Sequence, residues 1–141
     1  MTAETNKALV RNFYESVGRA DAEAAAATMA AECIHYFAGM PPLDVPAFKQ
    51  MVGMFFSAFP DFRVTIEDLV AEDGRVAMRS LWRGTHQGEL MGVPPTGKAV
   101  TVLEQHIFRI ADGKIAEHWS VMDQMGLMQQ LGAIPVPGQS Q

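Results

Sequence analysis

The stretch KAVTVLEQHIFRIADGKIAEHWSVM, residues 98–122, decides the fold. It is rich in β-branched and aromatic residues and is interrupted once, at Ala111-Asp112-Gly113. Such a pattern around Asp-Gly is typical of two strands joined in a hairpin. The stretch FRVTIEDLVAEDGRVAMRSLWRGTHQG, residues 62–88, repeats the pattern around Glu72-Asp73-Gly74. We therefore predict four antiparallel strands in the second half of the chain.

The first 60 residues predict helices instead. Apolar residues recur at four-residue spacing over residues 4–21, and this spacing predicts an amphipathic helix. Asp21 is a good N-cap for a second helix over the alanine-rich residues 22–31. A short strand is expected over residues 33–39, and a third helix is expected from residue 44 until Pro60 stops it. Helices followed by strands indicate an α+β fold with an antiparallel sheet.

The geometry of the two Asp-Gly turns decides which side chains share a face. Asp-Gly fits a two-residue turn, or a three-residue turn with Gly in the left-handed region and a bulge. We favour the three-residue form, in which Ile110 pairs with Lys114. The two-residue form would seat His106 beside Trp119, because a shift of one residue exchanges the two faces of a strand.

In the three-residue register one face of the second hairpin is mostly apolar. It carries Val100, Val102, Glu104, His106, Phe108, Ala116, His118, Ser120 and Met122, with His106 opposite His118 and Glu104 opposite Ser120. The first hairpin adds Val64, Ile66, Asp68, Met78, Ser80 and Trp82 to this face. An apolar surface with a few convergent polar groups suits a small-molecule pocket. The other face carries Leu103, Ile107, Ile115, Glu117, Trp119 and Val121, a set that favours a homodimer through the outer sheet face.

Composition limits the class of protein. The net charge of −5 argues against nucleic acid or an anionic membrane as a partner. Cys33 is the only cysteine, so an internal disulfide is impossible and a buried thiol is expected. Neither a secretory signal nor a membrane-length apolar segment is visible, and we expect a cytoplasmic protein.

Three phrases resemble the SnoaL-like polyketide cyclase family, in particular its ester cyclase branch in the nuclear-transport-factor-2-like superfamily. They are FPDFRVTIEDLVAEDGRVAMR, GTHQGELMGVPPTGK and HIFRIADGKIAEHWSVMDQMGLMQQLG. The resemblance covers nearly the whole chain. It implies a cone-shaped α+β barrel in which a curved antiparallel sheet wraps the N-terminal helices around a deep pocket, and dimers packed through the sheet. We expect a single domain over residues 1–134 and a flexible tail over residues 135–141.

The resemblance also implies a reaction. A carboxylate removes a proton from a carbon flanked by carbonyl groups, and the enolate attacks an aldehyde or ketone to close a ring. This chemistry needs no metal or cofactor, because the flanking carbonyls already acidify the C–H bond. In the family's cyclases a His stands at the position of His106, and an Asp follows the Trp of the EHW motif as the general acid/base. This chain has Ser120 there.

The candidate catalytic residues are His106, Glu104 and Ser120, and the candidate substrate-binding residues are His118, Trp82, Phe108, Met78 and Asp123. The expected ligand is a small hydrophobic carbonyl or polyketide-like compound. Structural alternatives stay open: hydrogen-bonded core histidines, and Asp123 as a helix cap. Glu104, His106 and His118 also have the residue types of a two-His-one-carboxylate metal site, but we assign no metal. A non-catalytic ligand-binding protein and a diverged hydroxylase-like member are the alternative functions.

Overall fold

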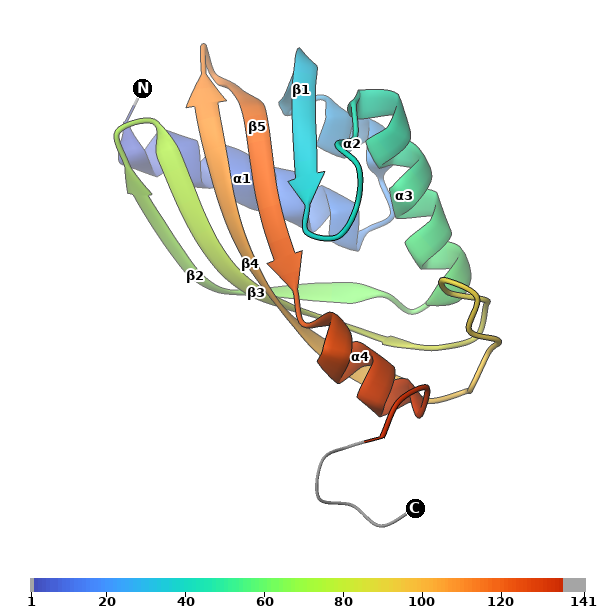
Figure 1. The fold of residues 1–141 in the computed structure, drawn as a ribbon. Helices are drawn as coiled ribbons and strands as arrows, with labels where there is room; N and C mark the ends of the chain where they lie inside the picture. The colour runs from blue at the N-terminus through green and yellow to red at the C-terminus, as the bar shows by residue number, and fades with distance from the viewer. Residues whose placement is uncertain (1, 136–141) are drawn as a thin grey trace.

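The computed structural model describes residues 2–135, so the expected tail lies outside the described residues from position 136 on. The elements are α1 (Ala3–Gly18), α2 (Ala22–Ala26), β1 (Met29–Phe37), α3 (Val45–Ala58), β2 (Arg63–Glu72), β3 (Arg75–Thr85), β4 (Ala99–Ala111), β5 (Lys114–Met122) and α4 (Gln124–Leu131). Helices α1 and α3 lie on one side of a strongly curved sheet (Figure 1). The α+β prediction is confirmed.

The sheet has five strands in the order β1-β5-β4-β3-β2. The pairs β2–β3, β3–β4 and β4–β5 are antiparallel, whereas β1 joins β5 in parallel. The sheet is therefore mixed, and the prediction of a wholly antiparallel sheet is wrong for β1. The sequence of a strand does not show the direction of its partner, and the partner of β1 lies about 80 residues further along the chain.

The second predicted helix is much shorter than its alanine content indicates. It begins after the Asp21 cap, ends at Ala26, and is followed by β1 from Met29. Met29 and Cys33 are buried in the main core cluster, where β1 pairs with β5. Strand pairing and burial thus override the helix propensity of alanine, which is only a weak prior.

Both Asp-Gly pairs form two-residue turns, so the predicted three-residue turns are wrong. Glu72 pairs with Arg75 across one turn, and Ala111 pairs with Lys114 across the other. The Asp and the Gly of each turn have positive φ, near 51° and 74°. This is the type I′ geometry, whose twist matches that of the flanking strands.

A bulge in β5 restores the predicted faces beyond the turn. Ile110 pairs with Ile115 but Arg109 pairs with Glu117, so Ala116 is the extra residue. His118 and Ser120 consequently point inward and are buried, as predicted. Ile115, which lies between the turn and the bulge, is buried in the core rather than on the outer face.

The predicted partners across this hairpin are nevertheless wrong by two residues. His106 lies opposite Ser120, His118 opposite Phe108, and Glu104 opposite Met122. His106 and His118 are therefore diagonal neighbours on one face, still within reach of each other.

The first hairpin shows the same combination of turn and bulge. Its register shifts between Ile66 and Asp68, so Glu67 is the extra residue. Asp68 lies opposite Arg79 and forms a 2.6 Å ion pair with it on the exposed side of the sheet. Asp68 lies between the turn and the bulge, as Ile115 does in the second hairpin. The prediction that Asp68 faces the interior is therefore wrong.

The core consists of two clusters between the sheet and the helices. One packs α1 and α3 against the sheet around Phe13, Phe48 and Phe108. The other surrounds Trp82 and includes Leu127 of α4. No helix within residues 2–135 is long and apolar enough to cross a membrane.

Candidate functional site

An interior pocket of about 60 Å³ lies between helices α1 and α3 and the inner face of the sheet. It is lined by Phe13, Tyr14, Val17, Phe37, Phe48, Met51, Val52, Phe55, Phe56, Phe62, Trp82, Glu104, His106 and His118. Most of these side chains are apolar, and the polar ones come mainly from strands β4 and β5. The space holds only a few water molecules. An organic ligand therefore needs the pocket to widen.

A second space of about 60 Å³ adjoins the interior pocket. The two share Phe37, Met51, Phe55 and Glu104, and the second adds Ser120, Met122 and Gln124 among its lining residues. Met51 and Phe55 of α3 thus form part of the partition between the two spaces. Glu104 reaches both, so a ligand that displaced this partition would contact Glu104 and Ser120 together.

Glu104 lies at the polar end of the interior pocket. The Tyr14 hydroxyl donates a 2.8 Å hydrogen bond to Glu104 Oε1, and His106 Nε2 lies 3.4 Å from the same oxygen. The Glu104 side chain is 17% exposed, so its carboxylate is neither sealed off nor fully hydrated. Burial, and next the Glu104 charge, raise the pKa of Tyr14 far above its ordinary value. Tyr14 therefore remains a protonated donor at all ordinary pH values.

Ser80 links Tyr14 to His106. Its hydroxyl oxygen lies 2.9 Å from Tyr14 Oη and 3.0 Å from His106 Nε2, and all three residues are buried. The three side chains and Glu104 form one continuous hydrogen-bonded network at the end of the pocket. Buried polar groups in such a network hold one another in fixed orientations.

Three histidines extend this network across three strands. His106 Nδ1 lies 2.9 Å from His118 Nε2, and His118 Nδ1 lies 2.8 Å from His35 Nδ1. His35 on β1 stands opposite His118 in the strand register. Burial lowers the pKa of His35 to about 4, and burial together with the two neighbouring imidazoles lowers the pKa of His118 well below its ordinary value. Both side chains are therefore neutral near pH 7.

The structure brings together four of the candidate residues: Glu104, His106, His118 and Trp82 all line the interior pocket. Ser120 lies in the adjoining space. The other candidates have different surroundings. Phe108 is stacked on His118, with ring centroids 4.2 Å apart, and Met78 lies in the core. The Asp123 carboxylate accepts a 2.8 Å hydrogen bond from the Gly126 N–H and caps α4.

Sequence reasoning missed Tyr14 and His35 as members of the site. Tyr14 lies within the helical pattern of residues 4–21, where nothing in the sequence marks it as polar, and its contact with Glu104 spans 90 residues. A signal for His35 existed: Cys33, His35 and Phe37 alternate along a strand, and Cys33 was expected to be buried.

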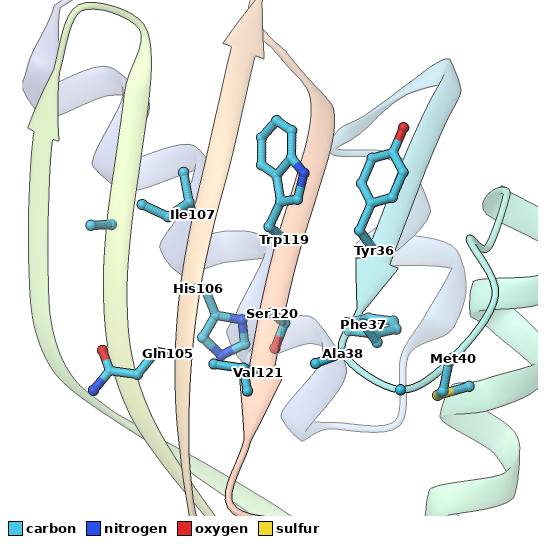
Figure 2. Close-up of a pocket in the computed structure, with 12 residues that line it drawn as sticks. Tyr36, Phe37, Ala38, Met40, Gln105, His106, Ile107, Trp119, Ser120 and Val121 are labelled. Atoms are coloured by element: carbon cyan, nitrogen blue, oxygen red, sulfur yellow. The ribbon is translucent and has the colours of Figure 1, made fainter.

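A larger hollow of about 620 Å³ lies on the opposite, outer face of the sheet. Trp119, Ile107 and Val121 of β4 and β5 line it together with Tyr36 of β1 (Figure 2). His106 and Ser120 also border this hollow, but Tyr14, Glu104 and His118 line the interior pocket and not the hollow. We therefore place the candidate site in the smaller interior pocket. No group of three or more potential metal ligands is arranged to hold an ion within residues 2–135.

Two known proteins that resemble this chain in sequence are both named as methyl ester cyclases. Nogalonic acid methyl ester cyclase of Streptomyces nogalater is 34% identical over 93 residues, which are 61% of this chain and 65% of that protein. Aklanonic acid methyl ester cyclase DnrD of Streptomyces peucetius is 43% identical over 49 residues, 35% of this chain and 34% of that protein. The matched segments thus span less than two thirds of either relative's length.

Solved structures match over almost the whole chain. AclR of Streptomyces galilaeus, a proposed hydroxylase, is 31% identical with a TM-score of 0.88, over 97% of this chain and 87% of its own. IdmH of Streptomyces antibioticus, a proposed polyketide cyclase, is 30% identical with a TM-score of 0.80, over 90% of this chain and 98% of its own. The family described as SnoaL-like polyketide cyclase matches residues 8–131. The chain therefore belongs to the SnoaL-like polyketide cyclase family.

Proposed function

We propose that the protein is a cofactor-free enzyme of the aldol-type cyclase or isomerase class, acting by acid/base chemistry on a small hydrophobic carbonyl compound in the cytoplasm. One observation carries the proposal. A partly buried carboxylate, Glu104, lies at the polar end of an aromatic pocket and accepts a hydrogen bond from Tyr14. Such a carboxylate in a largely water-excluded site is suited to proton transfer.

Glu104 is the proposed base, and it acts on a carbon between two carbonyl groups. Its carboxylate takes the proton, and the electron pair of the C–H bond moves onto a carbonyl oxygen as an enolate. The enolate carbon attacks a second carbonyl carbon and forms the C–C bond. The alkoxide left by this attack takes the proton back from Glu104, so no proton is gained or lost overall. His106 and the Ser120 hydroxyl stabilise the oxygens on which charge develops.

The lining of the pocket favours a neutral ester over a free acid. The described residues that line the interior pocket and the adjoining space include no lysine or arginine, and they include the Glu104 carboxylate. A carboxylate ligand would thus meet charge repulsion without a compensating cation. The relatives named as methyl ester cyclases are consistent with an esterified substrate.

Ser120 stands where the resemblance places the base, and we assign it an orienting role. Its strand position is buried and faces the space that adjoins Glu104. A hydroxyl with no activating base cannot remove the substrate proton near pH 7. It can donate a hydrogen bond to a substrate oxygen.

The direct experiment is a ring-closing aldol assay on a β-keto methyl ester that carries an aldehyde. We expect wild type to be active, Ser120→Ala to keep at least about a tenth of its kcat, and Glu104→Gln to lose about 10²- to 10⁴-fold. A Ser120→Ala variant as inactive as Glu104→Gln would overturn the division of roles. If wild type is inert and Ser120→Asp also gains no activity, the cyclase proposal is wrong.

A hydroxylase-like activity is the second candidate, because AclR superposes on the chain with a TM-score of 0.88. The two candidates differ in their product. An aldol product has the mass of the substrate and forms without oxygen, whereas hydroxylation adds one oxygen atom. If the protein binds the ligand but turns it over neither with nor without oxygen, it is a non-catalytic binding protein.

We also propose a homodimer through the outer face of the sheet. Ile107, Val121 and Leu103 are exposed there, and Trp119 and Tyr36 stack at its centre with ring centroids 5.7 Å apart. Exposed apolar patches of this kind are typical of protein interfaces.

A further inference from the structure

The three histidines His35, His118 and His106, which we call the histidine relay, form two short nitrogen–nitrogen contacts of 2.8 and 2.9 Å. All three side chains are buried. A contact this short between two ring nitrogens contains one proton, because two lone pairs or two N–H groups would repel each other. The ring nitrogens that carry protons can therefore be identified by counting the N–H groups along the relay.

When all three imidazoles are neutral they carry three N–H protons, and two of these protons fill the two contacts. The third lies at one end of the relay, on His106 Nε2 or on His35 Nε2. A neutral relay has only these two arrangements, and they differ in the tautomer of every ring. The low pKa values of His35 and His118 keep both of these rings neutral.

The hydrogen bonds at the Glu104 end select between the two arrangements. Tyr14 is protonated and donates to the Glu104 carboxylate, so the proton between Tyr14 and Ser80 comes from the Ser80 hydroxyl. Ser80 then accepts the hydrogen bond from His106 Nε2, 3.0 Å away. The opposite order would leave no proton between the Ser80 and Tyr14 oxygens, which are only 2.9 Å apart.

The sulfur atoms at the far end suit the same arrangement. His35 Nε2 lies 3.7 Å from Cys33 Sγ and 3.4 Å from Met29 Sδ. Burial raises the pKa of the Cys33 thiol to about 11, so the thiol keeps its proton. A bare His35 Nε2 can accept a weak hydrogen bond from this S–H group.

We propose that His118 and His35 are positioning residues which hold His106 with its proton on Nε2, facing the pocket as a hydrogen-bond donor. The proposal rests on the proposed function and assigns distinct roles within it. Glu104 is the base, and the His106 Nε2–H group that Ser80 accepts also serves as the donor to the enolate oxygen. In this arrangement His118 carries its proton on Nε2 and His35 carries its proton on Nδ1.

Two substitutions of His35 separate positioning from packing. His35 stacks on Phe48 with ring centroids 4.2 Å apart, so His35→Phe keeps an aromatic ring there and removes the donor to His118. His35→Asn removes the ring but keeps an N–H donor near the position of Nδ1. A purely structural histidine would be replaced better by Phe, whereas a positioning histidine would be replaced better by Asn.

The test is the ¹⁵N spectrum of the imidazole nitrogens in the full-length protein at pH 7.5. In wild type we expect the Nε2–H tautomer for His106 and His118 and the Nδ1–H tautomer for His35. His35→Phe should mix the tautomers of His106, and His35→Asn should restore one. A wild-type His106 in the Nδ1–H form would overturn the proposal even if neither variant folds. So would an unchanged His106 spectrum in a folded His35→Phe variant.

Turnover gives a second readout. We expect His35→Phe to lower kcat about tenfold, the effect of losing one hydrogen bond, with KM within twofold of wild type. His35→Asn should recover part of the loss. Equal kcat in wild type and His35→Phe would contradict the positioning role. The spectra need no turnover, so an inert protein with the expected tautomers rejects the proposed function and keeps the relay.

Discussion

The chemistry of Glu104 depends on the neighbours that the fold gives it. Sequence reasoning identified Glu104, His106 and His118 because they alternate along strands with apolar residues, and the structure places all three in one pocket. It did not identify Tyr14 as the donor to Glu104, because a helix stripe does not distinguish a phenol that packs from one that also donates. Contacts over 90 residues require the tertiary structure.

The buried relay should make stability depend on pH. His35 has a folded-state pKa of about 4, whereas an unfolded histidine titrates near its ordinary value of 6.5. Between these values the unfolded chain binds the proton and the folded chain does not. The contribution of His35 to the free energy of unfolding should therefore fall by about 3 kcal/mol as the pH drops from 6.5 to 4.

Denaturant unfolding at several pH values measures this dependence, with His35→Phe as the control that cannot bind the proton. We expect a smaller pH slope in the variant than in wild type, with His118 contributing the same sign in both. Parallel curves for the two proteins would show that His35 is not a buried neutral group.

At the scale of elements, the sequence predicted the hairpins better than their registers. The Asp-Gly turns were recognised, but their length and the extra residues Ala116 and Glu67 were not. The shorter turn and the extra residue of the bulge each exchange the two faces of the strand once, so together they restore the predicted faces and move the partners by two residues. Residues beyond each bulge, such as His118, therefore kept their predicted faces, and residues before it, such as Ile115 and Asp68, did not.

The end of β5 illustrates how a cap can resemble a site residue. Asp123 accepts a hydrogen bond from Gly126 N–H at the start of α4. We expect Asp123→Ala to lower the free energy of unfolding by about 1 kcal/mol, because an N-cap is lost. Asp123→Asn, which keeps a capping oxygen, should lose little. Thermal unfolding measures both variants.

The same variants decide between capping and substrate binding. With capping alone, Asp123→Ala should leave KM within twofold of wild type. A KM increase of tenfold or more in both Asp123→Ala and Asp123→Asn would instead place Asp123 at the substrate.

At the scale of the whole molecule, the fold and the sequence identify the family, whereas the reaction depends on the side chains of the site. A fold supports many activities, and the matched structures include both a proposed hydroxylase and a proposed cyclase. The two small interior spaces show that a substrate of several rings needs α3 to shift or its side chains Met51 and Phe55 to turn.

The proposed dimer is testable on the outer sheet face. Val121 is 50% exposed there, and Met54 on α3 is 60% exposed on the other side of the sheet. We expect wild type to be a dimer by light scattering coupled to size exclusion, Val121→Glu to be a monomer, and Met54→Glu to remain a dimer. A monomeric wild type, or a dimer disrupted only by Met54→Glu, would contradict this interface.

Proton abstraction by Glu104 is tested most directly by hydrogen–deuterium exchange, without ring closure. The measured quantity is the rate at which a β-keto methyl ester without a second carbonyl electrophile loses its α-proton in D₂O, followed by NMR. Wild type should accelerate the exchange over buffer, and Glu104→Gln should reduce that acceleration about 10²- to 10⁴-fold, as expected when a general base is removed. Equal acceleration by wild type and Glu104→Gln would contradict the assignment of Glu104 as the base.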